Sequence, residues 1–183
     1  ISNSDTVEFR RNYGLDAINA IPAYEAGATG NGIIVSVIDT GIDRDHPELI
    51  GRIHPSSTNV FDPALGVDDE DGHGTLVSGV IAANRNDISS HGVAFNAQIL
   101  AVRAEDPDTC AEDDGCTLSD FDIAKGVDHA RVNGARVINL SLGGDGASFG
   151  LLEAIDRATS SGIIVVVSAG NTDDDTTDAE RAN

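Results

Sequence analysis

The sequence predicts an α/β fold in which helices cover both faces of a parallel β-sheet. The first observation is a series of short apolar segments of strand length, and the second is that segments of helix length separate them. The third is that these short segments are apolar at nearly every position, which is typical of strands buried on both faces. We find no repeat or linker within residues 1–183, so we expect one domain or part of one.

The first half of the chain should contain two helices and two strands. Tyr13–Ala26 has the spacing of an amphipathic helix that is interrupted or restarted at Pro22. Gly32–Asp39 is a short apolar run that ends in an acid, and we expect a strand there. His73–Ala83 is rich in small residues and predicts a buried helix, and Ala97–Arg103 predicts the second strand.

The second half should continue the alternation. Leu118–Asn133 predicts a helix, with Ser119 as its N-cap and Gly134 as its C-cap. The remaining expected elements are a strand, a helix and a strand: Arg136–Leu142, Gly150–Ser160 and Gly162–Val167.

The composition excludes several classes of partner. Acids outnumber bases by 31 to 11, giving a formal net charge of −20, which argues against binding to nucleic acid or to an anionic membrane surface. No apolar run reaches the length of a membrane span, and no signal peptide is visible. The chain begins at Ile1 and contains no methionine, so we expect a processed or trimmed product.

The two cysteines lie in an acidic segment. Cys110 and Cys116 could close a small disulfide ring, which would suit a secreted protein. Two free thiols or a metal clip are the alternatives. A zinc site would need two more ligands, and this segment offers only carboxylates, so we favour the disulfide.

Polar or small residues follow three of the four expected strands. They begin at Asp39, Ser141 and Ser168, and because the carboxyl ends of parallel strands share one edge, they should converge there. A buried Asp39 is costly unless it is paired, although it could also cap the following turn. His73 could be a structural group at a helix start, or it could pair with Asp39 and act as a base near neutral pH.

Two further segments have both a structural and a functional interpretation. Asn171 could be a turn residue, or it could donate a hydrogen bond to a developing oxyanion. The strand end formed by Ser141, Leu142, Gly143 and Gly144 could be a simple turn, or it could pair with an extended peptide.

Together these residues resemble the subtilisin-like serine proteases, also called subtilases or peptidase family S8. The resemblance rests on four motifs in order: VIDTGID (37–43), DGHGTLVSGVIAA (71–83), INLSLGG (138–144) and VVSAGN (166–171). It implies the subtilisin-like fold, with Asp39 as the catalytic acid, His73 as the general base and Asn171 as the oxyanion donor. It further implies that a protein or peptide substrate lies along Ser141 to Gly144. The acidic insertion and the opening segment look most like secreted bacterial members, some of them autotransporter passengers, so we expect a secreted or cell-surface protein.

The family's nucleophilic serine has no counterpart in this chain. The Gly-Thr-Ser motif is expected well beyond Asn171, whereas Ser78, Ser141 and Ser168 belong to other motifs. We therefore expect residues 1–183 to be the N-terminal portion of one catalytic domain, inactive alone, with the C-terminal remainder of the same enzyme as a partner.

The chemistry implied by the resemblance requires no cofactor, but structural calcium is possible. Members of the family often hold calcium in a loop after the His helix, and here Asn84–His91 has a suitable length, with Asn86 and Glu48 as candidate ligands. The insertion around Asp108–Asp114 is a second oxygen-rich candidate. Solvated loops are the alternative in both places.

The acids just before His73 suggest a substrate preference. We hypothesise that Asp69, Glu70 and Asp71 raise the pKa of His73 and favour basic substrate residues near the cleaved bond; a solvated acidic loop is the alternative.

Three functions compete. The leading one is a serine endopeptidase, and the second is a non-catalytic peptide-binding module that uses the same groove. A nucleotide-binding domain is set aside, because the dinucleotide fingerprint is missing and the acids at Asp39 and Asp43 would repel phosphate.

Overall fold

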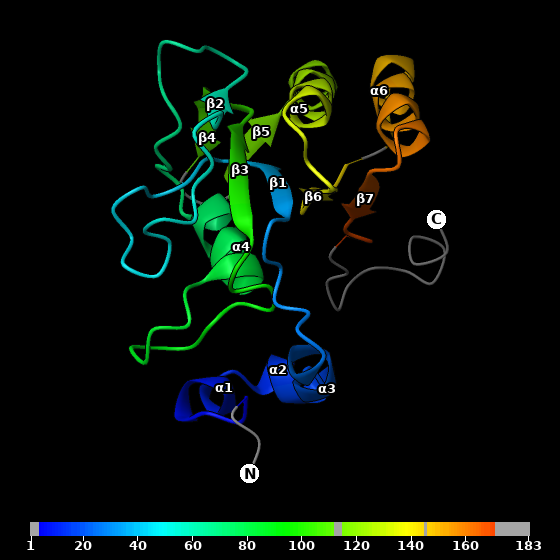
Figure 1. Cartoon of the computed structure of the whole chain (residues 1–183). Coiled ribbons are helices and arrows are strands. Elements are labelled where there is room, and N and C mark those ends of the chain that lie inside the picture. Colours follow the sequence, from blue (N-terminus) through cyan, green and yellow to red (C-terminus); the bar gives the residue numbers. More distant parts are fainter. Residues whose placement is uncertain (1–3, 112–114, 145, 171–183) are drawn as a thin grey trace, which may run out of the picture.

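The computed structural model describes residues 4–111, 115–144 and 146–170 (Figure 1). Its main sheet has the strand order β2-β3-β1-β6-β7, and every pairing in it is parallel. The strands are β1 (Ile34–Asp39), β2 (Thr58–Asn59), β3 (Gln98–Arg103), β6 (Val137–Leu140) and β7 (Ile164–Val167). The parallel sheet expected from the sequence is therefore confirmed.

Helices cover both faces of this sheet. The larger ones are α4 (His73–Ala82), α5 (Asp120–Val132) and α6 (Phe149–Ser160). Within β1, Val35 and Val37 pack on the side of α4, whereas Ile38 packs on the side of α5 and α6. This alternation follows from the two-residue period of a strand, and it explains why β1 has apolar residues on both faces. Figure 1 shows α5 and α6 side by side, with α4 apart from them.

Helix α5 is positioned by its cap and by a glycine. The hydroxyl of Ser119 accepts a hydrogen bond from the backbone N–H of Asp122, which confirms the expected N-cap. At the other end the C-cap is Asn133 and not the expected Gly134, which follows it with φ +83°. A Cβ at Gly126 would lie 3.1 Å from a methyl carbon of Ile38, so the glycine permits the close approach of α5 to β1.

The N-terminal segment forms three short helices. These are α1 (Val7–Arg11), α2 (Tyr13–Ala17) and α3 (Ile21–Glu25). The single interrupted helix predicted from Tyr13 to Ala26 is thus two helices, because Asn19 adopts φ 53° between them. Pro22 lies in the first turn of α3, where its missing N–H costs no helical hydrogen bond. Phe9 and Tyr24 pack edge to face and anchor these helices to one another.

Two features were not anticipated. The acidic segment that holds the two cysteines is a hairpin of β4 (Glu105–Ala111) and β5 (Gly115–Leu118), paired antiparallel, so Leu118 ends a strand and does not begin the next helix as predicted. Its many aspartates disfavour strands on propensity alone, so cross-strand pairing decides the structure. Strand β2 has two residues, which is too short for a periodic signal.

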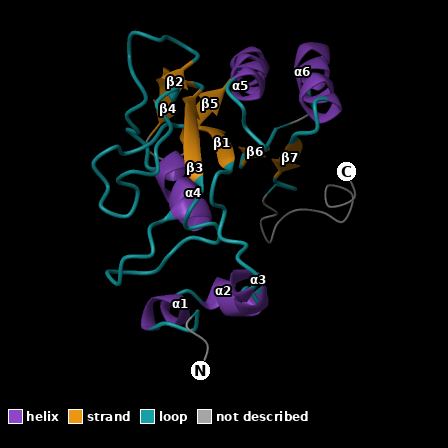
Figure 2. Ribbon diagram, viewed as in Figure 1, coloured by secondary structure: helices purple, strands orange, loops and turns teal. Residues whose placement is uncertain are grey.

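Long connections rather than helices link β1 to β2 and β2 to α4 (Figure 2). No helix in the described part of the chain has the length and apolar character that crossing a bilayer requires.

Candidate active site

Asp39 ends β1 with a buried carboxylate. Its side chain is 1% exposed, and Oδ1 accepts a hydrogen bond from the backbone N–H of Thr40 at 2.8 Å. The same oxygen lies 2.7 Å from Nδ1 of His73. Burial raises the pKa of Asp39, against the lowering effect of the hydrogen bonds from His73 and Thr40. Among the described residues, Oδ2 has no hydrogen-bond partner.

His73 is the first residue of α4. Gly72 precedes it with φ +102°, a conformation that directs the chain into the helix. A Cβ at Gly74 would lie 2.4 Å from the carbonyl oxygen of Gly41, so only glycine lets the helix start this close to β1. The hydrogen bond to Asp39 raises the pKa of His73, although partial burial opposes it. The side chain of His73 remains 47% exposed, so the imidazole is accessible from solvent.

Asp69 organises the loop that leads to His73. Its Oδ1 accepts from the hydroxyl of Thr40 and the N–H of Gly72, both at 2.8 Å. Its Oδ2 accepts from the N–H of Thr75 at 2.9 Å and also from the hydroxyl of that residue. Burial alone would raise the pKa of Asp69, but these hydrogen bonds outweigh it and lower the pKa. Asp69 therefore stays ionised and holds the loop to the end of β1.

Arg103 ties the same loop to the hairpin. It ends β3, pairs in register with Asp39, and is almost fully buried. One guanidinium nitrogen donates to the carbonyl oxygen of Asp68 at 2.6 Å, and another forms an ion pair with Glu105 at the base of β4. No local pattern in the sequence predicted this link, because Asp68 lies 35 positions before Arg103.

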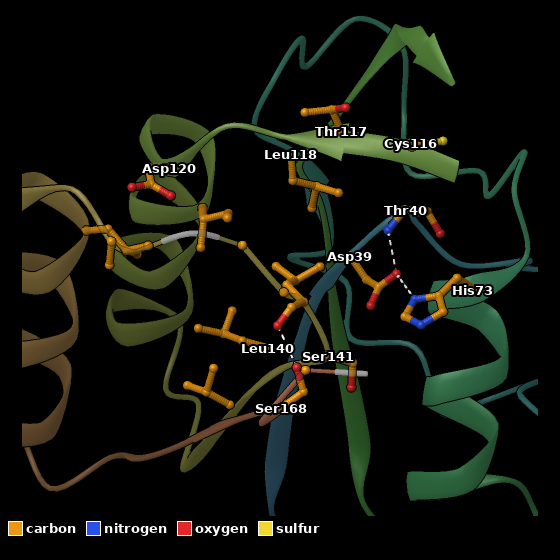
Figure 3. A pocket seen from close by; sticks show the side chains of 18 of the residues that line it. Asp39, Thr40, His73, Cys116, Thr117, Leu118, Asp120, Leu140, Ser141 and Ser168 are labelled. Atoms are coloured by element: carbon orange, nitrogen blue, oxygen red, sulfur yellow. Dashed lines mark hydrogen bonds and ion pairs between the residues drawn. The ribbon is translucent and has the colours of Figure 1, made fainter. Parts of the chain in front are cut away.

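The carboxyl ends of β1, β6 and β7 meet in a cleft of about 970 Å³, as expected from the polar and small residues that follow them. Asp39 and His73 lie at one end of the cleft and point toward each other (Figure 3). All four residues of the predicted peptide-binding segment line it: Ser141, Leu142, Gly143 and Gly144. The structure thus brings these predicted site residues together.

Asn171 lies outside the described residues. The hydroxyl of Ser168 donates to the carbonyl oxygen of Leu142, which joins the segments that follow β6 and β7.

Sequence reasoning missed the contribution of the hairpin. Thr117 and Leu118 of β5 line the cleft together with Cys116. Figure 3 shows Leu118 on the opposite side of the cleft from Leu140. The apolar part of the lining continues into the helices with Ile123, Leu151 and Ile155. Since the hairpin itself was not predicted, nothing in the linear sequence placed these side chains near His73.

The structure pairs Cys110 with Cys116 in a disulfide, with their Cα atoms 3.9 Å apart. The two sulfurs and a carboxylate oxygen of Glu105 lie close together, but disulfide sulfurs carry no thiolate to bind a metal.

The first candidate calcium loop is organised by carboxylates. Asn86 donates from its side-chain amide to Glu48 at 3.0 Å, so these two predicted ligands are in contact. Glu8, which the sequence did not single out, accepts from the backbone N–H groups of Asn86 and Asp87. Both glutamates are buried, and Oε1 of Glu48 has no hydrogen-bond partner among the described residues. Such a set of hard oxygen donors fits a calcium ion. The second candidate, around Asp108–Asp114, lies partly outside the described residues.

Known proteins resemble this chain in both sequence and fold. A model described as the subtilase family matches residues 30–183. Fervidolysin from Fervidobacterium pennivorans is 38% identical over 167 residues, and subtilisin E from Bacillus subtilis is 39% identical over 163 residues. These matches cover 89% and 87% of this chain, which spans 24% and 39% of the two relatives.

Two solved structures extend the comparison to the fold. The crystal structure of fervidolysin, described as a keratinolytic enzyme related to subtilisin, superimposes with a TM-score of 0.75 at 38% identity, covering 90% of this chain and 25% of that one. The structure of MycP1 without its N-terminal propeptide superimposes with a TM-score of 0.69 at 28% identity. The match covers 89% of this chain and 50% of that one. The subtilisin-like fold expected from the sequence is thus confirmed.

Proposed function

The chain belongs to the subtilase family, and from this membership we propose that it carries the acid and the base of a serine endopeptidase. The observation that carries the proposal is the 2.7 Å contact between Oδ1 of Asp39 and Nδ1 of His73, within a cleft formed by the ends of three strands. A buried carboxylate bonded to an imidazole at the rim of a large cleft is an arrangement suited to proton transfer.

In the proposed mechanism Asp39 accepts the Nδ1 hydrogen of His73. This bond fixes the tautomer that leaves Nε2 free to accept a proton, and it stabilises the imidazolium that forms when the proton arrives. His73 then takes the proton of a serine hydroxyl during attack on the peptide carbonyl. It returns the proton to the leaving amine, as the general acid of the same cycle.

Substrate binding is assigned to the segment after β6. The backbone from Ser141 to Gly144 would pair with an extended peptide by strand addition, and the two glycines would let the peptide backbone approach closely. Asn171 would donate its amide N–H to the oxyanion of the tetrahedral intermediate.

The nucleophile is proposed to lie outside residues 1–183. Two serines line the cleft, but both hydroxyls are engaged away from His73: that of Ser141 accepts from Asn139, and that of Ser168 donates to Leu142. Residues 1–183 alone should therefore hydrolyse no peptide bond.

We also propose that the remainder of the enzyme packs against β7. Within the described chain β7 pairs only with β6, and its apolar side chains Ile164 and Val167 are 62% and 56% exposed. Apolar exposure of this kind on a strand is costly in water and is relieved when another segment covers it.

Calcium is proposed as a structural ion at the Asn84–His91 loop. Glu8, Glu48 and Asn86 would hold it, and the ion would neutralise two buried carboxylates that lack a cationic partner among the described residues.

Secretion or cell-surface display is proposed from the disulfide, since such bonds persist in oxidising compartments.

Labelling of the full-length protein with a fluorophosphonate tests the proposed function. A stoichiometric adduct on a serine beyond residue 183, abolished by His73→Ala but retained by Ser141→Ala and Ser168→Ala, is the expected result. If the folded protein forms no adduct, the endopeptidase proposal is wrong and a non-catalytic peptide-binding module takes its place.

A further inference from the structure

The hairpin of β4 and β5 has little backbone support of its own. Within the described chain the two strands form a sheet separate from the main one. Their ladder pairs Glu105 with Leu118 and Asp106 with Thr117, and its register then shifts before Ala111. A two-stranded hairpin is at best marginally stable in water unless something else holds it. The hairpin therefore depends on contacts beyond its own ladder.

Two side-chain links supply this support. At the base, Glu105 of β4 forms an ion pair with Arg103, which is almost fully buried. Beyond the shift in register, a disulfide joins Cys110 of β4 to Cys116 of β5. The ion pair fixes only the start of β4, so the disulfide is the covalent link that holds β5 against it.

The disulfide lies at the cleft that contains the proposed catalytic pair. Cys116, Thr117 and Leu118 are consecutive residues of β5, and all three line the cleft together with His73 (Figure 3). The sulfur of Cys116 lies 3.9 Å from Oδ2 of Asp71, two residues before His73. Part of the cleft wall is therefore the same short strand that the disulfide holds in place.

A small thiol can reach the sulfurs. The side chain of Cys110 is exposed and that of Cys116 is half-buried, and exposed disulfides are the ones that thiols reduce most readily. A carboxylate oxygen of Glu105 lies within 4.8 Å of both sulfurs, and Asp71 faces Cys116. These charges repel a reductant that carries a carboxylate, so a neutral or cationic thiol fits this disulfide best.

We propose that the disulfide between Cys110 and Cys116 is a redox switch of the cleft, which oxidation completes and a small thiol loosens. The inference rests on the proposed function, because it concerns the regulation of the same cleft. A thiolate attacks the sulfur of Cys110 and forms a mixed disulfide, while Cys116 leaves as a thiolate and takes a proton from water. A second thiol group then displaces Cys110, which leaves two cysteine thiols and one oxidised disulfide of the reductant.

Reduction should loosen β5 while the catalytic pair stays in place. The bond between Asp39 and His73 joins β1 to α4, and Asp69 holds the intervening loop through Thr40; β5 contributes none of these bonds. Without the disulfide, an extended peptide that enters the cleft must order the lining residues of β5 again, which costs affinity. A reducing compartment thus keeps the enzyme weak, and an oxidising one completes its cleft.

The test follows cleavage of an extended peptide by the full-length protein before and after treatment with dithiothreitol, a neutral dithiol. We expect KM to rise about three- to tenfold on reduction, with kcat within about twofold, and reoxidation to restore the original KM. Fluorophosphonate labelling needs the catalytic groups but no extended peptide, so its rate should stay the same. Mass spectrometry after alkylation identifies the cysteines that were reduced.

The double variant Cys110→Ser, Cys116→Ser is the matched control, because residues 1–183 contain no other cysteine. It should show the raised KM without reductant and no response to dithiothreitol. Its fluorophosphonate labelling reports whether it folds. In the unmodified protein, hydrogen exchange of the β4 and β5 amides should become faster on reduction, whereas exchange of the β1 amides should not.

The outcomes distinguish the two proposals. An unchanged KM in protein whose Cys110 and Cys116 are shown to be reduced overturns the switch and leaves the endopeptidase standing. A response of the double variant to dithiothreitol, or loss of fluorophosphonate labelling together with cleavage, also overturns it, since the effect then comes from elsewhere in the protein. Neither cleavage nor a fluorophosphonate adduct in the oxidised protein overturns the endopeptidase and with it this inference.

Discussion

The hydroxyl of Thr40 donates a hydrogen bond to Asp69 at 2.8 Å, and this bond connects the end of β1 to the loop before His73. The same hydroxyl oxygen accepts from the backbone N–H of Gly74 at 2.9 Å. Thr40 thus joins three segments at the point where Asp39 and His73 must meet. The geometry of the proposed catalytic pair depends on this junction as much as on the pair itself.

Replacing Asp69 by asparagine should destabilise the fold. An amide cannot accept at both positions, so a donor of Thr75 or Thr40 would lose its partner, at a cost of about 1–3 kcal/mol if that donor stays shielded from water. Urea unfolding followed by circular dichroism measures the change. Asp68→Asn, which breaks only an exposed ion pair with Arg44, should change stability little.

The pH dependence of stability should separate Asp69 from its neighbours. Its pKa is lowered in the folded state, so its contribution is present above the ordinary value of 3.8 and is lost as pH falls through the folded pKa. The Asp69→Asn variant should lack this component of acid unfolding. An acid-unfolding curve with the same steepness in both proteins would contradict the assignment.

Two glycines of α4 should respond in opposite directions to the same substitution. Gly74→Ala places a methyl group 2.4 Å from the carbonyl oxygen of Gly41, so the helix must move away from β1. Overpacking of this kind costs about 1–3 kcal/mol. Gly79→Ala meets nothing within 4 Å, and by helix propensity it should be neutral or stabilise the protein by up to about 1 kcal/mol.

Thermal unfolding of the two alanine variants measures this contrast. In Gly74→Ala the separation of Asp39 from His73 should also remove the low-field imidazole proton resonance of His73. Equal melting temperatures for the two variants would mean that the start of α4 is not held against β1.

The sequence predicted the parts of the molecule that carry their own local signal. The apolar run before Asp39 predicted a strand buried on both faces, and the serine at position 119 predicted the cap of the helix that follows it. The convergence of Asp39, His73 and the segment from Ser141 to Gly144 then followed from parallel strand geometry.

What escaped prediction depends on contacts between distant segments. Leu118 reaches the cleft because β4 and β5 pair, and that pairing overrides the poor strand propensity of an aspartate-rich segment. Glu8 approaches Asn86 across 78 positions of sequence, and Asp69 gathers its donors from Thr40 as well as from its own loop. No local pattern encodes such partners, since each is selected by the fold as a whole.

Removal of calcium should lower the melting temperature if Glu8 and Glu48 hold the ion. Without the ion, no calcium neutralises the buried carboxylates of Glu8 and Glu48. Buried negative charge of this kind lowers the stability of the fold. Differential scanning fluorimetry with and without excess EGTA measures the shift, and added calcium should reverse it. Glu48→Gln should remove most of the response to calcium, whereas Asp108→Asn in the hairpin should retain it. A melting temperature independent of calcium would contradict the proposed site.

The titration of His73 tests the pairing at the centre of the proposed function. Its hydrogen bond to Asp39 raises the pKa, with smaller contributions from the charges of Asp71 and Asp69, so the imidazole should titrate above its ordinary value of 6.5. A raised folded pKa means that the stabilisation from this pair is fully present below pH 6.5 and is lost as pH rises through the folded value. The pH dependence of catalysis has the opposite direction, because His73 must be neutral to accept a proton. We therefore expect kcat/KM to fall as pH drops below the folded-state pKa of His73.

Imidazole NMR of the 183-residue chain follows this titration without any need for catalysis. Asp39→Asn should lower the midpoint of His73 most, because it removes the strongest of the raising interactions. Asp71→Asn should lower it less, through lost charge alone, and Glu70→Gln should leave it nearly unchanged. A midpoint unaffected by Asp39→Asn would mean that the two side chains are not bonded in solution, and the assignment of His73 as an oriented base would then lose its physical basis.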